Sequence, residues 1–223
     1  VAVYEVSGIT ANGNNQARKL AEIATVSQEA LAPNVLLGKQ IFYNAKDRRM
    51  NRDGYLSCAS CHLDGEQDGR VWDFSDRGEG WRNTISLRGR RGTGQGRLHW
   101  SANFDEVQDF EHDIRNAFGG AGFMRDSDFN SGTRKQPLGE RKAGLSVELD
   151  ALAAYVTSLA ETPASPQRNA NGALTNAARF GKMIFQRQKC GRCHGGNDFT
   201  DSFSGVRHEV GTIKPTSGNR LGE

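Results

Sequence analysis

The 223-residue chain has no run of apolar residues long enough to cross a membrane, which takes about 20 predominantly apolar residues. Its mean hydropathy is −0.65. It also lacks a charged-then-apolar segment at its start, so we expect a mature or excised piece rather than a precursor. No run of lysine or arginine is present and the net charge is only +3. The sequence therefore predicts no membrane span and no nucleic-acid partner.

Cysteine is scarce, and the four cysteines of the chain all fall in two copies of one pattern. Residues 58–62 read CASCH, and residues 190–194 read CGRCH. A structural zinc site would have its two C-x-x-C pairs about 15–20 residues apart, whereas most of the chain separates these two. Neither a disulfide between near neighbours nor a thioredoxin-like motif explains a histidine directly after each pair. These alternatives are therefore disfavoured.

The pattern C-x-x-C-H is the attachment signature of c-type haem. The two sulfurs form thioethers with the porphyrin, and the following imidazole binds the iron. The sequence thus predicts two covalently bound c-type haems. Their cofactor-binding residues are Cys58, Cys61 and His62 for haem 1 and Cys190, Cys193 and His194 for haem 2. Because such haems are attached outside the bacterial inner membrane, we expect a periplasmic or extracellular protein.

The surroundings of the two motifs also repeat. The pattern G-K-x-I-F occurs at residues 38–42 and again at 181–185. A D-F-S/T-D segment, expected to be a turn, follows each motif at residues 73–76 and 198–201. Two features repeated in the same order indicate two related haem domains.

The predicted fold is all-α, with two cytochrome c-like haem domains and a short N-terminal strand. Only 29 residues follow His194 (223 − 194), far fewer than follow the first motif, so we expect the second domain to be incomplete. A proline- and asparagine-rich stretch separates the domains. The predicted division is an N-terminal extension at 1–32, the first domain at 33–160, a linker at 161–172 and the second domain at 173–223.

Periodicity predicts the secondary structure. Residues 1–6 alternate and predict a strand without a visible partner, which would then be the tail of a preceding β domain in a longer chain. Asn103 and Glu106 have the spacing of a capping box at the start of one helix. Residues 119–124 predict a glycine-rich loop. The predicted helices are 16–31, 34–43, 103–118 and 146–159.

The sixth iron ligand of haem 1 decides between functions, because a filled position favours electron transfer and an open one favours peroxide chemistry. Met124 is the first candidate, since it lies on the glycine-rich loop ahead of a closing helix; alternatively it fills a gap in the core. His112 is second, and the alternative for it is a surface histidine on the polar helix face. His99 is third, with packing beside the haem edge as its alternative.

The order of motifs resembles the bacterial dihaem cytochrome c peroxidases and their relatives that oxidise tryptophan side chains. The resemblance is carried by residues 38–42, 57–62, 82–87 and 178–201. It implies two mainly helical cytochrome c domains, with one haem receiving electrons from a donor protein and passing them to the other. It also implies a calcium ion at the domain interface, for which Asn83 matches a ligand position; alternatively Asn83 only holds a turn.

Two departures from that family favour electron transfer. Residues 63–98 lack the family's distal histidine, and Phe123 precedes Met124 where the family has its catalytic glutamate. The first hypothesis is therefore a dihaem electron-transfer protein with haem 1 held by His62 and Met124, exchanging electrons with a redox donor or acceptor protein. The alternative is a peroxide-reducing cytochrome c peroxidase or related haem oxidase in which Glu111 is the catalytic acid–base group.

Overall fold

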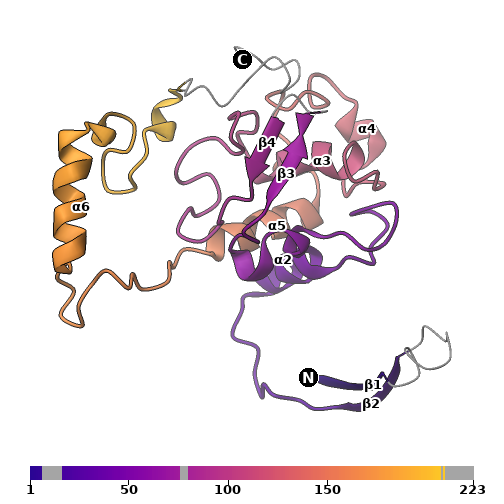
Figure 1. Cartoon of the computed structure of the whole chain (residues 1–223). Helices are drawn as coiled ribbons and strands as arrows, with labels where there is room; N and C mark the ends of the chain where they lie inside the picture. Colours follow the sequence, from indigo (N-terminus) through magenta and orange to yellow (C-terminus); the bar gives the residue numbers. More distant parts are fainter. Residues whose placement is uncertain (7–16, 76–79, 207, 209–223) are drawn as a thin grey trace. The chain divides into compact units, whose positions relative to one another are not determined.

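The computed structural model describes residues 1–6, 17–75, 80–206 and 208. The chain divides into two compact units, Val1–Ala32 and Pro33–Glu223. The boundary between the two predicted haem domains, at 161–172, stays a prediction. In chain order the elements are β1 (Ala2–Glu5), β2 (Arg18–Glu22), α2 (Pro33–Tyr43), η1 (Cys58–Ser60), η2 (Leu63–Gly65), β3 (Val71–Phe74), β4 (Gly80–Asn83), η4 (Val107–Phe110), α3 (Glu111–Arg115), α4 (Asp126–Phe129), α5 (Val147–Ser158), α6 (Asn176–Arg187), η5 (Cys190–Arg192) and η6 (Ser202–Ser204) (Figure 1).

The first unit is a two-stranded antiparallel ribbon. Strand β1 pairs with β2 in a register that matches Ala2 with Glu22 and Glu5 with Arg18. The strand predicted at 1–6 is confirmed, but its partner lies in this chain rather than in a preceding domain. The helix predicted at 16–31 is wrong, because β2 occupies its first part. Helix propensity is a weak preference, and pairing with the backbone groups of β1 overrides it here.

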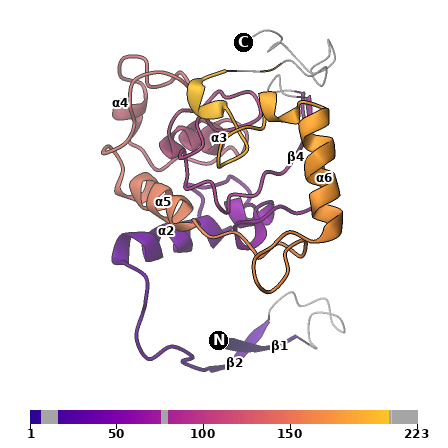
Figure 2. The ribbon, with the colours of Figure 1, turned by 90° about the vertical axis from the view of Figure 1, so that its left-hand side faces the viewer.

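The core of the second unit forms where α2 and α5 lie side by side (Figures 1 and 2). The helices meet at Gly38, where a Cβ atom would lie 1.9 Å from the carbonyl oxygen of Ala151. Phe42 and Tyr155 pack edge to face beside this contact, with ring centroids 5.1 Å apart. Both predicted helices are confirmed to within one residue, and α2 begins at Pro33, which suits the first helical position.

The helix predicted at 103–118 is shorter and starts later. The segment is a 3₁₀ turn, η4, followed by the single-turn helix α3. The predicted capping box is wrong: the Asn103 side chain instead pairs with His99, and the Asp109 carboxylate accepts from the amide of Glu106 at 3.2 Å. The same carboxylate forms a fully buried ion pair with Lys142 at 2.6 Å. Helical periodicity cannot predict this ion pair, because its two residues are far apart in the sequence.

His112 is buried, which contradicts its interpretation as a surface residue on the polar face of the helix. Its ring lies 5.1 Å from that of Phe129, at the end of α4. The segment carrying α4 covers the face of α3 that the helical pattern marks as polar. His112 is therefore part of the core.

Two further strands lie in the second unit, so the chain is mainly helical with a few short strands rather than all-α. Strands β3 and β4 pair antiparallel, with Val71 opposite Asn83 and Phe74 opposite Gly80. The segment expected to be a turn at 73–76 begins inside β3, and Asp76 lies outside the described residues. Within the described part of the chain, no helix is long and apolar enough to span a membrane.

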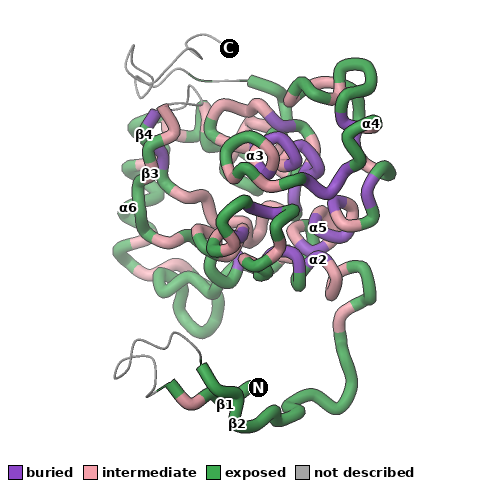
Figure 3. The backbone as a smooth tube through the Cα atoms, turned by 90° about the vertical axis from the view of Figure 1, so that its right-hand side faces the viewer, coloured by how far each residue is buried: buried purple, intermediate pink, exposed green. Residues whose placement is uncertain are grey.

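Helix α6 precedes the second C-x-x-C-H motif, as α2 precedes the first. Thr175 caps it by accepting from the amide of Ala178 at 3.2 Å. None of its residues is buried, and Phe180 and Met183 are 61% and 59% exposed (Figure 3). At Gly181, the counterpart of Gly38, an added Cβ would meet no atom within 4 Å. The repeated sequence therefore forms the same helix in two different environments.

Candidate functional site

The two C-x-x-C-H motifs have the same backbone conformation. In each, the amide of the histidine donates to the carbonyl of the first cysteine at 2.9 Å, and the amide of the second cysteine donates to that carbonyl at 3.3 Å. The second cysteine has φ/ψ of −110°/−35° at Cys61 and −105°/−37° at Cys193. The repeat predicted from the sequence is therefore also a structural repeat within the C-x-x-C-H motifs themselves.

No disulfide joins any of the four cysteines, and all four are partly buried. Burial raises the pKa of the Cys58 thiol to about 12. Cys58 is therefore a neutral thiol in an apolar setting, not an activated thiolate nucleophile. The two cysteine pairs are consistent with two c-type haems.

A cavity of about 360 Å³ lies beside the first motif. Cys58, Cys61 and His62 all line it. The rest of its wall is largely apolar and comes from α2, β3, the segment after β4, η4 and α5. Its apolar wall residues include Phe42, Phe74, Ile85, Phe110, Leu152 and Val156. An apolar cavity with both thiols and the imidazole in its wall suits a covalently attached porphyrin.

His62 has the state that iron ligation requires. Burial lowers its pKa, against the opposing influence of the nearby backbone of Glu66 and Ile85, so the imidazole is neutral at neutral pH. Its Nδ1 is buried without a hydrogen-bond partner among the described residues. A buried polar atom left unpaired is costly in free energy. His112 Nε2 is likewise buried and unpaired among the described residues, but His62 differs from it in lying in the cavity wall.

His194, the matching residue of the second motif, is exposed. Its Nδ1 lies 3.2 Å from the carbonyl oxygen of Phe199. A metal-binding histidine usually donates its other ring N–H in this way, which fixes the tautomer and leaves Nε2 for the metal. The second motif therefore also has a ligand geometry, although its surroundings are open. After this motif, Nε2 of His208 lies 2.7 Å from Oδ2 of Asp201.

Of the three predicted distal candidates, His99 is the one that lines the cavity. Its Nδ1 lies 2.9 Å from Oδ1 of Asn103, and its Nε2 lies 3.6 Å from Oδ2 of Asp113, which also lines the cavity. The ring packs against Phe104 and Phe110, with centroids 4.4 and 4.9 Å away. The structure thus brings His99 and Asp113 to the same cavity as His62.

Met124, the first-ranked ligand candidate, is buried in the core and is not part of the cavity wall. The same holds for His112 and Glu111. The Glu111 carboxylate accepts from the amides of Phe123 and Met124 at 2.9 and 3.0 Å and from Arg115 at 2.7 Å. The structure therefore does not place the predicted catalytic carboxylate, or the predicted Met124 and His112 ligands, at the cavity.

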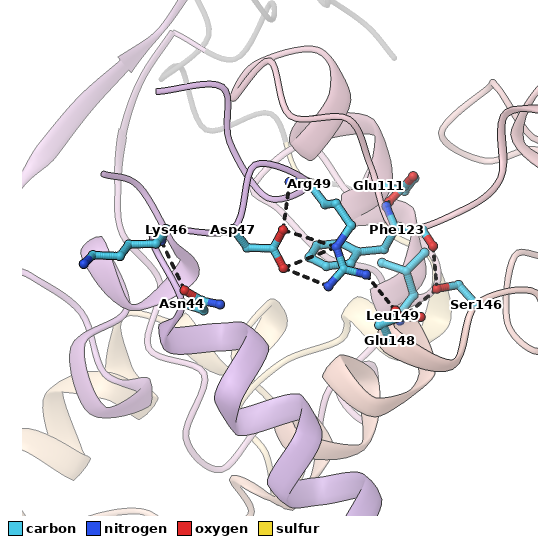
Figure 4. Close-up of polar contacts among 9 residues, drawn as sticks. All are labelled: Asn44, Lys46, Asp47, Arg49, Glu111, Phe123, Ser146, Glu148 and Leu149. Atoms are coloured by element: carbon cyan, nitrogen blue, oxygen red, sulfur yellow. Dashed lines mark hydrogen bonds and ion pairs between the residues drawn. The ribbon is translucent and has the colours of Figure 1, made fainter. Parts of the chain in front are cut away.

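The loop that carries Met124 is also fixed from its other side (Figure 4). The Phe123 carbonyl accepts from the hydroxyl of Ser146 at 2.9 Å, and the Arg49 guanidinium lies 4.7 Å from the centre of the Phe123 ring. Arg49 in turn pairs with Asp47 at 2.8 Å and with Glu148 at 2.7 Å. Contacts on both sides hold Met124 in the core.

Asn83 lies at the end of β4 and lines the cavity. Its carbonyl accepts from the indole N–H of Trp100 at 2.9 Å. Among the described residues, no group of three or more His, Cys, Asp or Glu side chains gathers as a metal site. The calcium role of Asn83 therefore has no support in this structure.

Sequence reasoning missed Asp113 and Arg90, which also line the cavity. The sequence offers one weak signal for Asp113. Neighbouring residues in a helix point in different directions, so Asp113 and His112 cannot both face the same side of the predicted helix. Nothing in the sequence marks Arg90 among the neighbouring arginines.

We compared the chain with protein families, with curated proteins and with solved structures. No family model matches the chain. It is 34% identical over 179 residues to hydrazine synthase subunit gamma of Kuenenia stuttgartiensis, a match that covers 76% of this chain and 46% of the relative. A solved structure of hydrazine synthase from the same organism, pressurised with xenon, matches with a TM-score of 0.46 and 26% identity, covering 84% of this chain and 65% of that one.

The chain thus spans about half the length of the curated relative. The resemblance to dihaem peroxidases is not shown by these matches. The sequence identity shows instead that this chain is homologous to hydrazine synthase subunit gamma over most of its length.

Proposed function

We propose that this chain is a c-type cytochrome that holds two covalently bound haems and transfers electrons between them. The observation that carries the proposal is the apolar cavity of about 360 Å³ with both thiols and the imidazole of the first motif in its wall. When bound, a c-type haem supplies a one-electron redox centre. The relative is named as a subunit of hydrazine synthase, so we extend the proposal to a place in a similar multisubunit enzyme in the periplasm.

Different residues of the chain would bind the haem, surround it and connect it to a partner protein. Cys58 and Cys61 would hold haem 1 covalently, and His62 would hold its iron. The apolar side chains of α2, η4 and α5 would pack against the porphyrin and so reduce the contact of the haem with water. Trp100 lines the cavity and is also exposed, so its ring offers a donor or acceptor protein a path to the haem edge.

A second candidate function rests on the His99–Asp113 pair. With a haem bound, an imidazole and a carboxylate in this otherwise largely apolar cavity could orient a small molecule and supply a proton to it. This favours a haem enzyme of the peroxide-reducing or oxidase type as the alternative. His99, rather than Glu111, would then be the acid–base group. If His99 binds the iron instead, haem 1 is closed and electron transfer remains.

Covalent haem attachment is tested first. We expect protein produced with a c-type maturation system to retain two haems per chain after denaturation, measured by pyridine haemochrome absorbance and by intact mass. Cys58→Ala/Cys61→Ala and Cys190→Ala/Cys193→Ala should each lose one haem. Full haem loss on denaturation of the wild type would overturn the proposal.

The spin state of haem 1 then separates the two functions. For electron transfer we expect low-spin ferric iron that becomes high-spin and peroxide-reactive in His99→Ala. Met124→Leu is the matched control and should leave the spectrum unchanged, since Met124 lies outside the cavity wall. High-spin wild-type iron that reacts with peroxide would establish the enzyme instead, and a change only in Met124→Leu would restore the original ligand prediction.

A further inference from the structure

The cavity wall holds a second charged side chain besides Asp113. Arg90 lines the cavity from the loop after β4. Burial lowers its pKa, and no anion acts in the opposite direction. Its neighbour Arg88 pairs with Glu66 at 3.2 Å, whereas no ion pair or hydrogen bond joins Arg90 to any other described residue. A partly desolvated guanidinium in the wall of this cavity therefore lacks an anion among the described residues.

The loop places Arg90 firmly. The amide of Gly89 donates to the carbonyl of Leu159 just after α5, at 2.8 Å. At Gly92, φ is +65° and an added Cβ would lie 2.9 Å from the hydroxyl oxygen of Thr157. Both glycines flanking Arg90 are thus packed against the end of α5. The backbone that carries the guanidinium is fixed relative to the helix that lines the cavity.

We propose that Arg90 binds a propionate carboxylate of haem 1. The proposal rests on the haem function proposed above. Propionates are the anionic groups of a porphyrin, and a planar guanidinium matches a carboxylate with two parallel hydrogen bonds. The otherwise largely apolar wall would contact the porphyrin ring, while Arg90 would bind a propionate at the edge of that ring.

A cation at this place disfavours the more positive ferric state and so raises the reduction potential of haem 1. We expect Arg90→Gln to change the ferric-to-ferrous ratio at a fixed potential roughly tenfold toward ferric, a negative shift of about 59 mV for one electron. Arg90→Lys keeps the charge but not the bidentate geometry, so its shift should be smaller. Resonance Raman should show the propionate bending band displaced in both variants.

Arg91→Gln is the matched control, because Arg91 is the adjacent arginine and is exposed. It should shift the potential by less than a quarter of the Arg90→Gln value. The titrations are made on the full chain and repeated with Cys190→Ala/Cys193→Ala, which identifies the wave of haem 1. If Arg90→Gln fails to keep haem 1, the Raman band of Arg90→Lys decides.

Equal shifts in Arg90→Gln and Arg91→Gln, or an unchanged potential and an unchanged Raman band with haem 1 in place, would overturn the proposal. Absence of covalent haem from the wild type would be a different failure, because it would refute the haem function itself. Haem content is therefore measured on each sample before its potential.

Discussion

At the scale of single residues, the carboxylate predicted to act as an acid–base group holds the core together. Glu111 accepts from three donors, and the nearby Asp109 pairs with a fully buried lysine. The cavity instead uses His62, His99 and Arg90. Helical periodicity places a residue on a face, but it does not say which distant segment covers that face.

Removing the Glu111 carboxylate should destabilise the protein without reaching the cavity. Glu111→Ala leaves two buried amides and Nε of Arg115 without their acceptor, while the Arg115 guanidinium keeps its ion pair with Asp126, and we expect a loss of about 1–3 kcal/mol in the free energy of unfolding. Glu148→Ala, which removes a partly exposed partner of Arg49, should cost about 0–1 kcal/mol. Guanidinium titration measures both. A Glu111→Ala protein of normal stability but altered haem spectrum would return Glu111 to the site.

His112 should make stability depend on pH. Burial, with a smaller contribution from Lys142, lowers its pKa to about 4 from the ordinary 6.5, so only the neutral ring suits the folded state. The contribution is fully present above pH 6.5 and is lost as the pH falls toward 4. Between pH 6.5 and 5 this amounts to about 2 kcal/mol. In His112→Leu the free energy of unfolding should fall less over that interval, and an identical pH profile would contradict the prediction.

At the scale of elements, the internal repeat provides a matched pair of glycines. Gly38→Ala would push a methyl group into the carbonyl of Ala151 and should cost about 1–3 kcal/mol. Gly181→Ala meets nothing within 4 Å and should stabilise α6 by about 0.5–1 kcal/mol through helix propensity alone. Thermal unfolding followed by far-ultraviolet circular dichroism compares them. Equal effects at both sites would show that α2 and α5 do not pack as described.

The sequence predicted elements whose signal is local and missed those that depend on distant partners. Helix α2 begins at Pro33, α5 begins at the Ser146 cap, and the C-x-x-C-H motifs have a fixed local spacing. The β1–β2 and β3–β4 ribbons depend on pairing across residues that carry no strong strand pattern, such as Arg18–Glu22. Likewise, the charged and polar residues of the cavity come from separate loops, so no spacing in the sequence links them.

At the scale of the whole molecule, the proposed haem 1 would also be a structural component. Without it, the largely apolar wall of the cavity of about 360 Å³ would stay in contact with water, and the folded state would lose that hydrophobic contribution to its stability. We therefore expect Cys58→Ala/Cys61→Ala, which cannot retain haem 1, to lose cooperative unfolding. Cys190→Ala/Cys193→Ala should keep it, since residues 190–194 are partly or fully exposed. Sharp calorimetric transitions in both would contradict this.

The partly buried, neutral thiol of Cys58 also has a consequence for the order of maturation. Folding of α2 and α5 around the cavity restricts access to that sulfur, and the raised pKa keeps the thiol in its less reactive form. The residues of the second motif are partly or fully exposed, so folding does not restrict access to its cysteines in the same way. Haem 1 should therefore be attached while the chain is still unfolded, so that its maturation precedes folding, whereas haem 2 can be added afterwards.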